Sequence, residues 1–133
     1  DPVLKRIKMR DYLWHADALK RVRGGSQSNS LTVPIQIAAL GGAVFVFFPF
    51  ETLTPTGNAA EAMFLQKGWP EEEIFVVSCA NRTYGYLAPS ALIPQGGYEM
   101  CEAAHWYGLP ECCEQSEEAV LDGVRGLSEL MTR

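Results

Sequence analysis

One stretch of this chain constrains its fold more than any other, because two apolar runs flank a helix signal. The run AVFVFFPF (43–50) is apolar throughout, as expected for a strand buried on both faces. Thr54 followed by Pro55 predicts the N-cap and first turn of a helix, and Gly68 favours its end. The run IFVVSCA (74–80) predicts another strand. Strand, helix and strand at this spacing form a βαβ unit, whose crossover is almost always right-handed and whose strands are parallel.

The residues before this unit predict a further strand joined to it by a tight turn. LTVPIQI (31–37) alternates in polarity, which is typical of a strand with one buried face. Its apolar side is formed by Leu31, Val33, Ile35 and Ile37. Pro34 favours an edge position because proline donates no ladder hydrogen bond. Gly41-Gly42 between two strand-like runs predicts a β-hairpin, so we expect a mixed sheet.

Amphipathic helices are predicted near both ends of the chain. Residues 3–22 carry apolar side chains at helical spacing, namely Met9, Tyr12, Leu13, Ala16 and Leu19. Residues 116–131 are expected to turn inward Val120, Leu121, Val124, Leu127 and Leu130. Between them lie the sheet and βαβ unit (31–80) and a site loop (81–100). We therefore expect one α/β domain over residues 1–133.

The uneven distribution of charge argues against a nucleic-acid partner. Seven of the 11 lysines and arginines precede Gly24, namely Lys5, Arg6, Lys8, Arg10, Lys20, Arg21 and Arg23. Asp11 and Asp17 interrupt this basic helix, and the formal net charge of the chain is -5. A surface that binds nucleic-acid phosphates needs an excess of positive charge. We interpret the basic residues as a solvated helix face.

The chain offers no candidate membrane span. Its longest largely apolar stretch, residues 37–50, is shorter than the roughly 20 residues of a membrane helix and contains Gly41 and Gly42. No signal peptide is recognisable at the start. The chain opens on Asp1 without a methionine, so we expect it to be a piece of a longer protein.

The four cysteines, Cys79, Cys101, Cys112 and Cys113, are too few for a disulfide framework in a chain of this length. Cys101 and His105 lie four residues apart, and with Cys112 and Cys113 they form a candidate structural zinc site. Adjacent cysteines rarely serve one tetrahedral ion. Buried or idle thiols are the alternative.

Glu51 ends the first apolar run, and a carboxylate there is costly unless a cation, hydrogen-bond donors or water receives it. Ala80-Asn81, Tyr84 and Tyr86 follow the second run. Because parallel strands end at the same edge of a sheet, we expect these polar groups to meet where α/β sheets place their sites. Alternatively, Glu51 caps the following helix, Asn81 forms a turn, and the tyrosines are core aromatics.

Four short motifs together carry a resemblance to a known family. They are Pro49-Phe50-Glu51-Thr52 after an apolar strand, then Ala80-Asn81, Gly85-Tyr86 and Gly96-Gly97-Tyr98-Glu99. In this order and near this spacing they resemble the C-terminal part of the catalytic domain of the neutral/alkaline (non-lysosomal) ceramidases and their uncharacterised relatives. The resemblance covers residues 31–131 and is most specific at Glu51 and over residues 80–99.

The resemblance implies a zinc-dependent amidohydrolase that cleaves the N-acyl amide of a sphingolipid or a similar lipid-like substrate. It assigns Glu51 and Tyr86 to the metal, and Tyr98 with Asn81 to the substrate. Tyr86 is preferred to Tyr84 because the metal tyrosine of the family lies twelve residues before its Tyr-Glu tyrosine. With the βαβ geometry, this predicts that Glu51 and Tyr86 open onto one cleft with Tyr98 at its rim.

The resemblance also implies what this chain lacks. Two further zinc ligands of the family are histidines in the N-terminal part of the domain, and His15 and His105 match neither. We therefore expect the isolated chain to be inactive, and its uncovered sheet to favour homo-oligomers. Family members often have tyrosine at the position of Thr83 and a Thr-Thr pair where this chain has Ala88-Pro89, so substrate contacts should differ.

Two hypotheses about function follow. In the first, the chain is part of a zinc amidase, located outside the cytoplasm if the family resemblance holds. In the second, it is a binding or structural domain that keeps the fold without metal chemistry.

Overall fold

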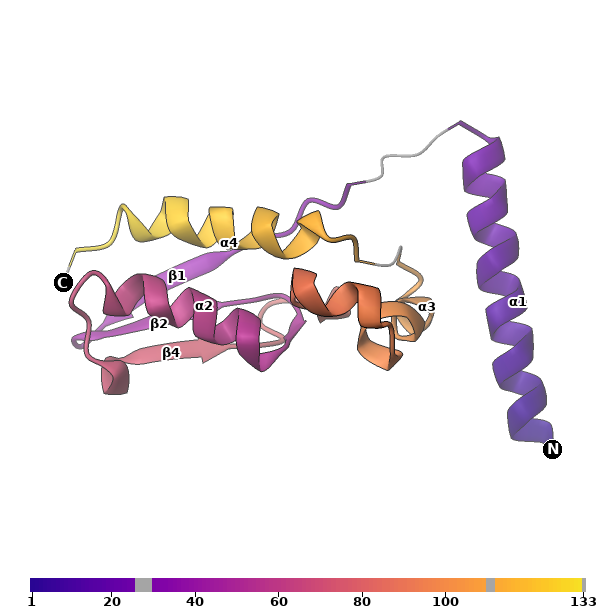
Figure 1. The fold of residues 1–133 in the computed structure, drawn as a ribbon, viewed down its shortest axis with the longest axis horizontal. Helices are drawn as coiled ribbons and strands as arrows, with labels where there is room; N and C mark the ends of the chain where they lie inside the picture. Colours follow the sequence, from indigo (N-terminus) through magenta and orange to yellow (C-terminus); the bar gives the residue numbers. More distant parts are fainter. Residues whose placement is uncertain (26–29, 110–111, 133) are drawn as a thin grey trace.

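The structure is a computed structural model that describes residues 1–25, 30–109 and 112–132. Figure 1 shows helix α1 (Pro2–Arg23) at one end, beside the short helix α3 (Ala104–Tyr107), and the sheet with its two long helices in the remainder. Part of the predicted loop GGSQSNS lies outside the described residues.

A three-stranded mixed sheet forms the centre of the molecule. Strand β2 (Ala43–Phe47) lies between β1 (Gln36–Leu40), to which it is antiparallel, and β4 (Ile74–Val77), to which it is parallel. Helix α2 (Thr54–Leu65) connects β2 to β4. The predicted hairpin and the predicted parallel pair are therefore both confirmed.

The hairpin turn consists of Gly41 and Gly42, with φ values of 61° and 92°. Positive φ at both central residues matches the twist of the flanking strands and favours glycine. The first strand begins later than expected, because the pairing with β2 starts at Gln36 opposite Phe47. The alternation persists before the strand, since Val33 and Ile35 pack against the core.

Helices α2 and α4 (Gln115–Ser128) cover one face of the sheet (Figure 1). The core beneath them joins buried side chains of β2 to both helices, namely Val44, Val46, Ala60, Phe64, Val120, Leu121 and Val124. Glu117 of α4 also links the helices, because its two carboxylate oxygens accept hydrogen bonds from the Thr56 hydroxyl (2.6 Å) and the Ser90 amide (2.7 Å). The buried Thr56 hydroxyl thus has the partner that burial requires.

Several predicted boundaries were wrong. Thr54 is the first residue of α2, not its N-cap, and the helix ends at Leu65 before Gly68. Strand β4 ends at Val77 instead of residue 80, since Cys79 and Asn81 have positive φ values of 55° and 65° and leave the extended conformation.

The last helix ends at Ser128, so Leu130 lies beyond it and is 77% exposed instead of facing inward. The predicted loop 81–100 also contains regular turns. A 3₁₀ segment (Ser90–Gln95) and a π-helical turn (Tyr98–Glu102) lead into α3.

Helix α1 is longer by one residue at each end than predicted, but its apolar side chains are mostly exposed, including Met9, Leu13 and Leu19. It contacts the remainder of the molecule through α3 and the residues that follow it. The Trp14 ring stacks on His105 with centroids 4.0 Å apart, and its indole N–H donates to the Leu109 carbonyl at 3.3 Å. Within the described residues, no helix is both long and apolar enough to cross a membrane.

Candidate functional site

Glu51 and Tyr86 meet through direct strand pairing. Glu51 begins the two-residue strand β3 (Glu51–Thr52), which runs parallel to β5 (Tyr86–Leu87) with Glu51 and Tyr86 in register. The Glu51 amide donates to the Gly85 carbonyl at 2.8 Å. The sequence predicted that these residues would come together, and the structure confirms their meeting. It did not predict this small second sheet.

Tyr107 is a third member of the site that sequence reasoning missed. It is the last residue of α3, and its hydroxyl donates a hydrogen bond to Glu51 Oε1. Its ring lies against Gly85, where an added Cβ would be only 3.2 Å from Tyr107 Cδ2. Gly85 also has a φ of 80°, which favours glycine. The sequence signal was this glycine beside Tyr86, which indicates a close approach but not the approaching residue.

The nearby Glu51 carboxylate keeps both phenols protonated, because it raises the pKa of each. The side-chain hydrogen bond to Glu51 raises the pKa of Tyr86 from 10.0 to about 12, helped by desolvation and by the negative charge of Glu51. The same causes raise the pKa of Tyr107 to about 12. Ionising either phenol would break its hydrogen bond and place a second negative charge beside the carboxylate. The Tyr107 phenol therefore supplies a partner that the Glu51 carboxylate requires in this structure.

A pH titration should show this coupling directly. We expect two phenols of the metal-free chain to ionise near pH 12, as followed by phenolate absorbance. Because these pKa values are raised on folding, the two protonated phenols stabilise the folded state. Their contribution to the free energy of unfolding is fully present below about pH 10 and is lost as the pH rises toward 12. In Glu51→Gln, both transitions should move toward pH 10, since the charge is gone. Transitions that stay near pH 12 in this variant would contradict the assignment.

The other predicted tyrosines and the asparagine have distinct positions. Tyr98 begins the π-helical turn, is 46% exposed, and meets the Tyr86 ring edge-on with centroids 6.0 Å apart. Tyr84 instead packs near Phe50, with ring centroids 6.1 Å apart. Asn81 occupies a turn, and its Nδ2 donates to Gln36 Oε1 at 2.7 Å. The substrate roles of Tyr98 and Asn81 stay predictions.

The alternative in which Glu51 caps the following helix is wrong. The N-cap of α2 is Leu53, and no side chain caps that end by a hydrogen bond. The Glu51 side chain instead accepts a hydrogen bond from the Tyr107 hydroxyl. The helix instead begins with Pro55 in its first turn, where a missing amide hydrogen costs little.

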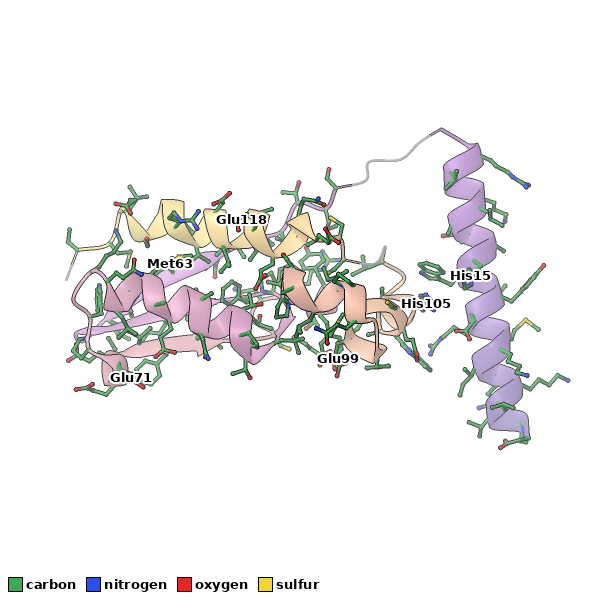
Figure 2. All side chains as sticks on the ribbon, in the orientation of Figure 1. His15, Met63, Glu71, Glu99, His105 and Glu118 are labelled. Atoms are coloured by element: carbon green, nitrogen blue, oxygen red, sulfur yellow. The ribbon has the colours of Figure 1, made fainter. Side chains whose placement is uncertain are left out.

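The histidines and the thiols make separate contacts. Figure 2 shows His15 and His105 at the junction of α1 and α3, where their ring centroids are 5.5 Å apart. The Cys112 thiol donates to the Tyr86 carbonyl at 3.2 Å, and burial raises its pKa, whereas Cys113 contacts Ser116. Across residues 1–25, 30–109 and 112–132, no three or more His, Cys, Asp or Glu side chains are grouped to hold a metal.

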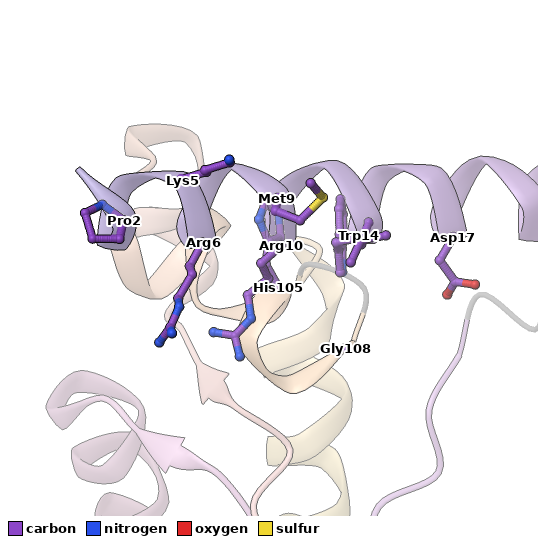
Figure 3. Close-up of a pocket in the computed structure, with 10 residues that line it drawn as sticks. Pro2, Lys5, Arg6, Met9, Arg10, Trp14, Asp17, His105 and Gly108 are labelled. Carbon is purple, nitrogen blue, oxygen red and sulfur yellow. The ribbon is translucent and has the colours of Figure 1, made fainter.

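An open cavity of about 700 Å³ lies along α1 where that helix meets α3 (Figure 3). It is lined by Pro2, Lys5, Arg6, Met9, Arg10, Leu13, Trp14, Asp17, His105 and Gly108. Neither this cavity nor a second one along α1 is lined by Glu51 or Tyr86. The cleft predicted beside Glu51 is therefore not one of these cavities. Tyr107 instead lies beside that carboxylate.

A scan against protein-family models and a search of curated proteins find no match to the chain. The ordered motifs and the meeting of Glu51, Tyr86 and Tyr107 are the features of the chain that point to a function.

Proposed function

We propose that the chain is the C-terminal portion of the catalytic domain of a zinc-dependent amidohydrolase resembling neutral ceramidase. The supporting observation is the parallel pairing of β3 with β5, which sets Glu51 opposite Tyr86. These residues belong to two of the four motifs that carry the resemblance, and they lie far apart in the sequence. A shared metal site gives a reason for their meeting.

The donors present fit part of a zinc site. The Glu51 carboxylate is a ligand that zinc accepts, and the Tyr86 phenol adds a second oxygen. Catalytic zinc usually takes three protein ligands and a water. The described residues contain no group of three or more His, Cys, Asp or Glu side chains that could hold a metal. The remaining ligands would therefore come from another part of the domain. The family resemblance assigns that role to two histidines.

The reaction proposed is hydrolysis of an amide, in which water adds to the carbonyl carbon and the C–N bond breaks to give a carboxylic acid and an amine. Bound zinc would polarise the carbonyl and acidify the attacking water. Glu51 would hold the ion, with Tyr86 as a second ligand. The exposed Tyr98 ring, edge-on to Tyr86, offers an apolar surface to an acyl chain.

The face of the sheet that α2 and α4 do not cover supports the proposal that the chain is part of a larger catalytic domain. On this face the Phe45 and Phe75 rings stack with centroids 4.9 Å apart, and Phe75 remains 44% exposed. Leu40 at the hairpin is 75% exposed. Apolar sheet faces normally pack against another layer. We propose that the N-terminal part of the domain covers this face, and that the isolated chain self-associates through it.

Metal analysis of the full-length protein tests the proposed function. We expect it to contain zinc and to hydrolyse an N-acylsphingosine. A chelator should abolish this activity and added zinc should restore it, because the ion polarises the reacting carbonyl. The isolated chain should be inactive, since it supplies only part of the ligand set. Full-length protein that takes up no zinc and cleaves no amide would contradict the proposal.

One observation favours the second candidate function, a binding or structural domain. Glu51 already accepts a hydrogen bond from the Tyr107 hydroxyl, so its carboxylate has a partner without a cation. A domain of this kind would bind its partner equally well with and without chelator. The metal experiment above therefore separates the two functions.

A further inference from the structure

We propose that Tyr107 is a positioning residue that orients the Glu51 carboxylate for its ligand. The meaning of this role for catalysis rests on the proposed zinc site, but the contact itself does not. The Tyr107 hydroxyl donates to Glu51 Oε1 from 56 residues further along the chain. A glutamate side chain has three rotatable bonds, so a fixed donor selects one of many carboxylate orientations.

Glu51 is fixed at its backbone and at its side chain by neighbouring groups. Its amide donates to the Gly85 carbonyl at 2.8 Å. The ring of Tyr107 lies against the same glycine, where a side chain would approach the ring within 3.2 Å. Gly85 therefore takes part in both contacts, and a Cβ at position 85 would crowd the Tyr107 ring whose hydroxyl donates to Glu51.

Helix α3, which carries Tyr107, is itself held from its other side. The guanidinium of Arg10 lies 3.9 Å from the centre of the Trp106 ring, and Trp14 stacks on His105. Both contacts come from α1. A helix of four residues has little stability of its own, so these contacts help to define the position of Tyr107.

The role follows from what a phenol contributes beside a metal-binding carboxylate. Tyr107 would remain a hydrogen-bond donor while Glu51 acts as the ligand. Partners of this kind orient the ligand, and their removal typically lowers metal affinity about 10–100-fold. Tyr107 acts through Glu51 and is therefore a positioning residue.

Tyr107→Phe tests the proposal, because it keeps the ring against Gly85 and removes the hydroxyl. Tyr12→Phe is the matched control, since Tyr12 is exposed on α1. In the metal-free 133-residue chain, we expect the ¹³C signal of the Glu51 carboxylate to shift in Tyr107→Phe and not in Tyr12→Phe. Its disappearance in Glu51→Gln assigns this signal.

The second measurement is zinc affinity of the full-length protein, by competition with a chelator. We expect Tyr107→Phe to bind zinc about 10–100-fold more weakly than wild type, and Tyr12→Phe to bind it equally. An unchanged Glu51 signal would overturn the proposal, whatever the protein does with zinc. A shifted signal with unchanged zinc affinity would overturn the positioning role and leave the zinc site intact. If wild type takes up no zinc, the proposed function fails, and the Glu51 signal alone decides the role of Tyr107.

Discussion

Glu51→Gln in the full-length protein is expected to lose zinc and amidase activity together. An amide is a neutral and poorer ligand than a carboxylate, so the site loses charge as well as a ligand. Partners outside the ligand shell are typically worth about 10–100-fold in affinity, and we expect loss of a ligand to exceed about 100-fold. The fold should persist, because glutamine has nearly the same shape and still accepts a hydrogen bond from a phenol. Metal content and hydrolysis rate are the measurements.

Glu71→Gln is the matched control for this change. Glu71 is an exposed glutamate in the 3₁₀ turn before β4. Figure 2 shows it well separated from Glu99, which follows Tyr98 in the chain. This variant should keep zinc and activity at the wild-type level. Glu51→Gln protein that holds zinc and hydrolyses amides as wild type does would contradict the assignment of Glu51.

Phe64→Ala is expected to cause the largest loss of stability. Phe64 is fully buried where α2 meets the sheet and α4. Truncating a buried phenylalanine to alanine removes its contacts and leaves a cavity, which typically costs about 3–5 kcal/mol in the free energy of unfolding. Small domains have only about 5–15 kcal/mol in total, so much of the stability would be lost. The midpoint of denaturant unfolding measures the change.

Leu65→Ala provides the comparison on the same helix. Leu65 is the next residue in α2 but is exposed, so its truncation should change the midpoint far less. Both variants should keep the same dependence on denaturant, since each unfolds the same structure. Equal losses in the two variants would show that the core is not centred on Phe64.

The sequence predicted the parts of the fold that depend on local patterns. Gly41-Gly42 predicted the hairpin because the turn needs residues that accept positive φ. The two apolar runs with a helix between them predicted that β2 and β4 would be parallel. The element ends were less predictable. Cys79, for example, leaves the strand through a φ of 55° that apolar patterning does not reveal.

Two of the three residues of the site, Glu51 and Tyr86, could be expected at one edge in the same way. Glu51 and Tyr86 each follow an apolar run, and topology brings the ends of parallel strands together. Tyr107 could not be found from spacing, because α3 is only four residues long and carries no clear periodicity. Its sequence neighbours His105 and Trp106 instead contact α1.

The sequence by itself determined the order of the main strands and helices, the hairpin, the three-stranded mixed sheet and the edge at which Glu51 lies. These features follow from side-chain periodicity and from backbone preferences that act over a few residues. Only the tertiary structure decided what receives the Glu51 carboxylate, because that choice depends on packing between segments remote in sequence. Gly85 leaves room for the ring of Tyr107, whose hydroxyl then reaches Glu51, and these contacts exist only once Tyr107 of α3 lies against Gly85.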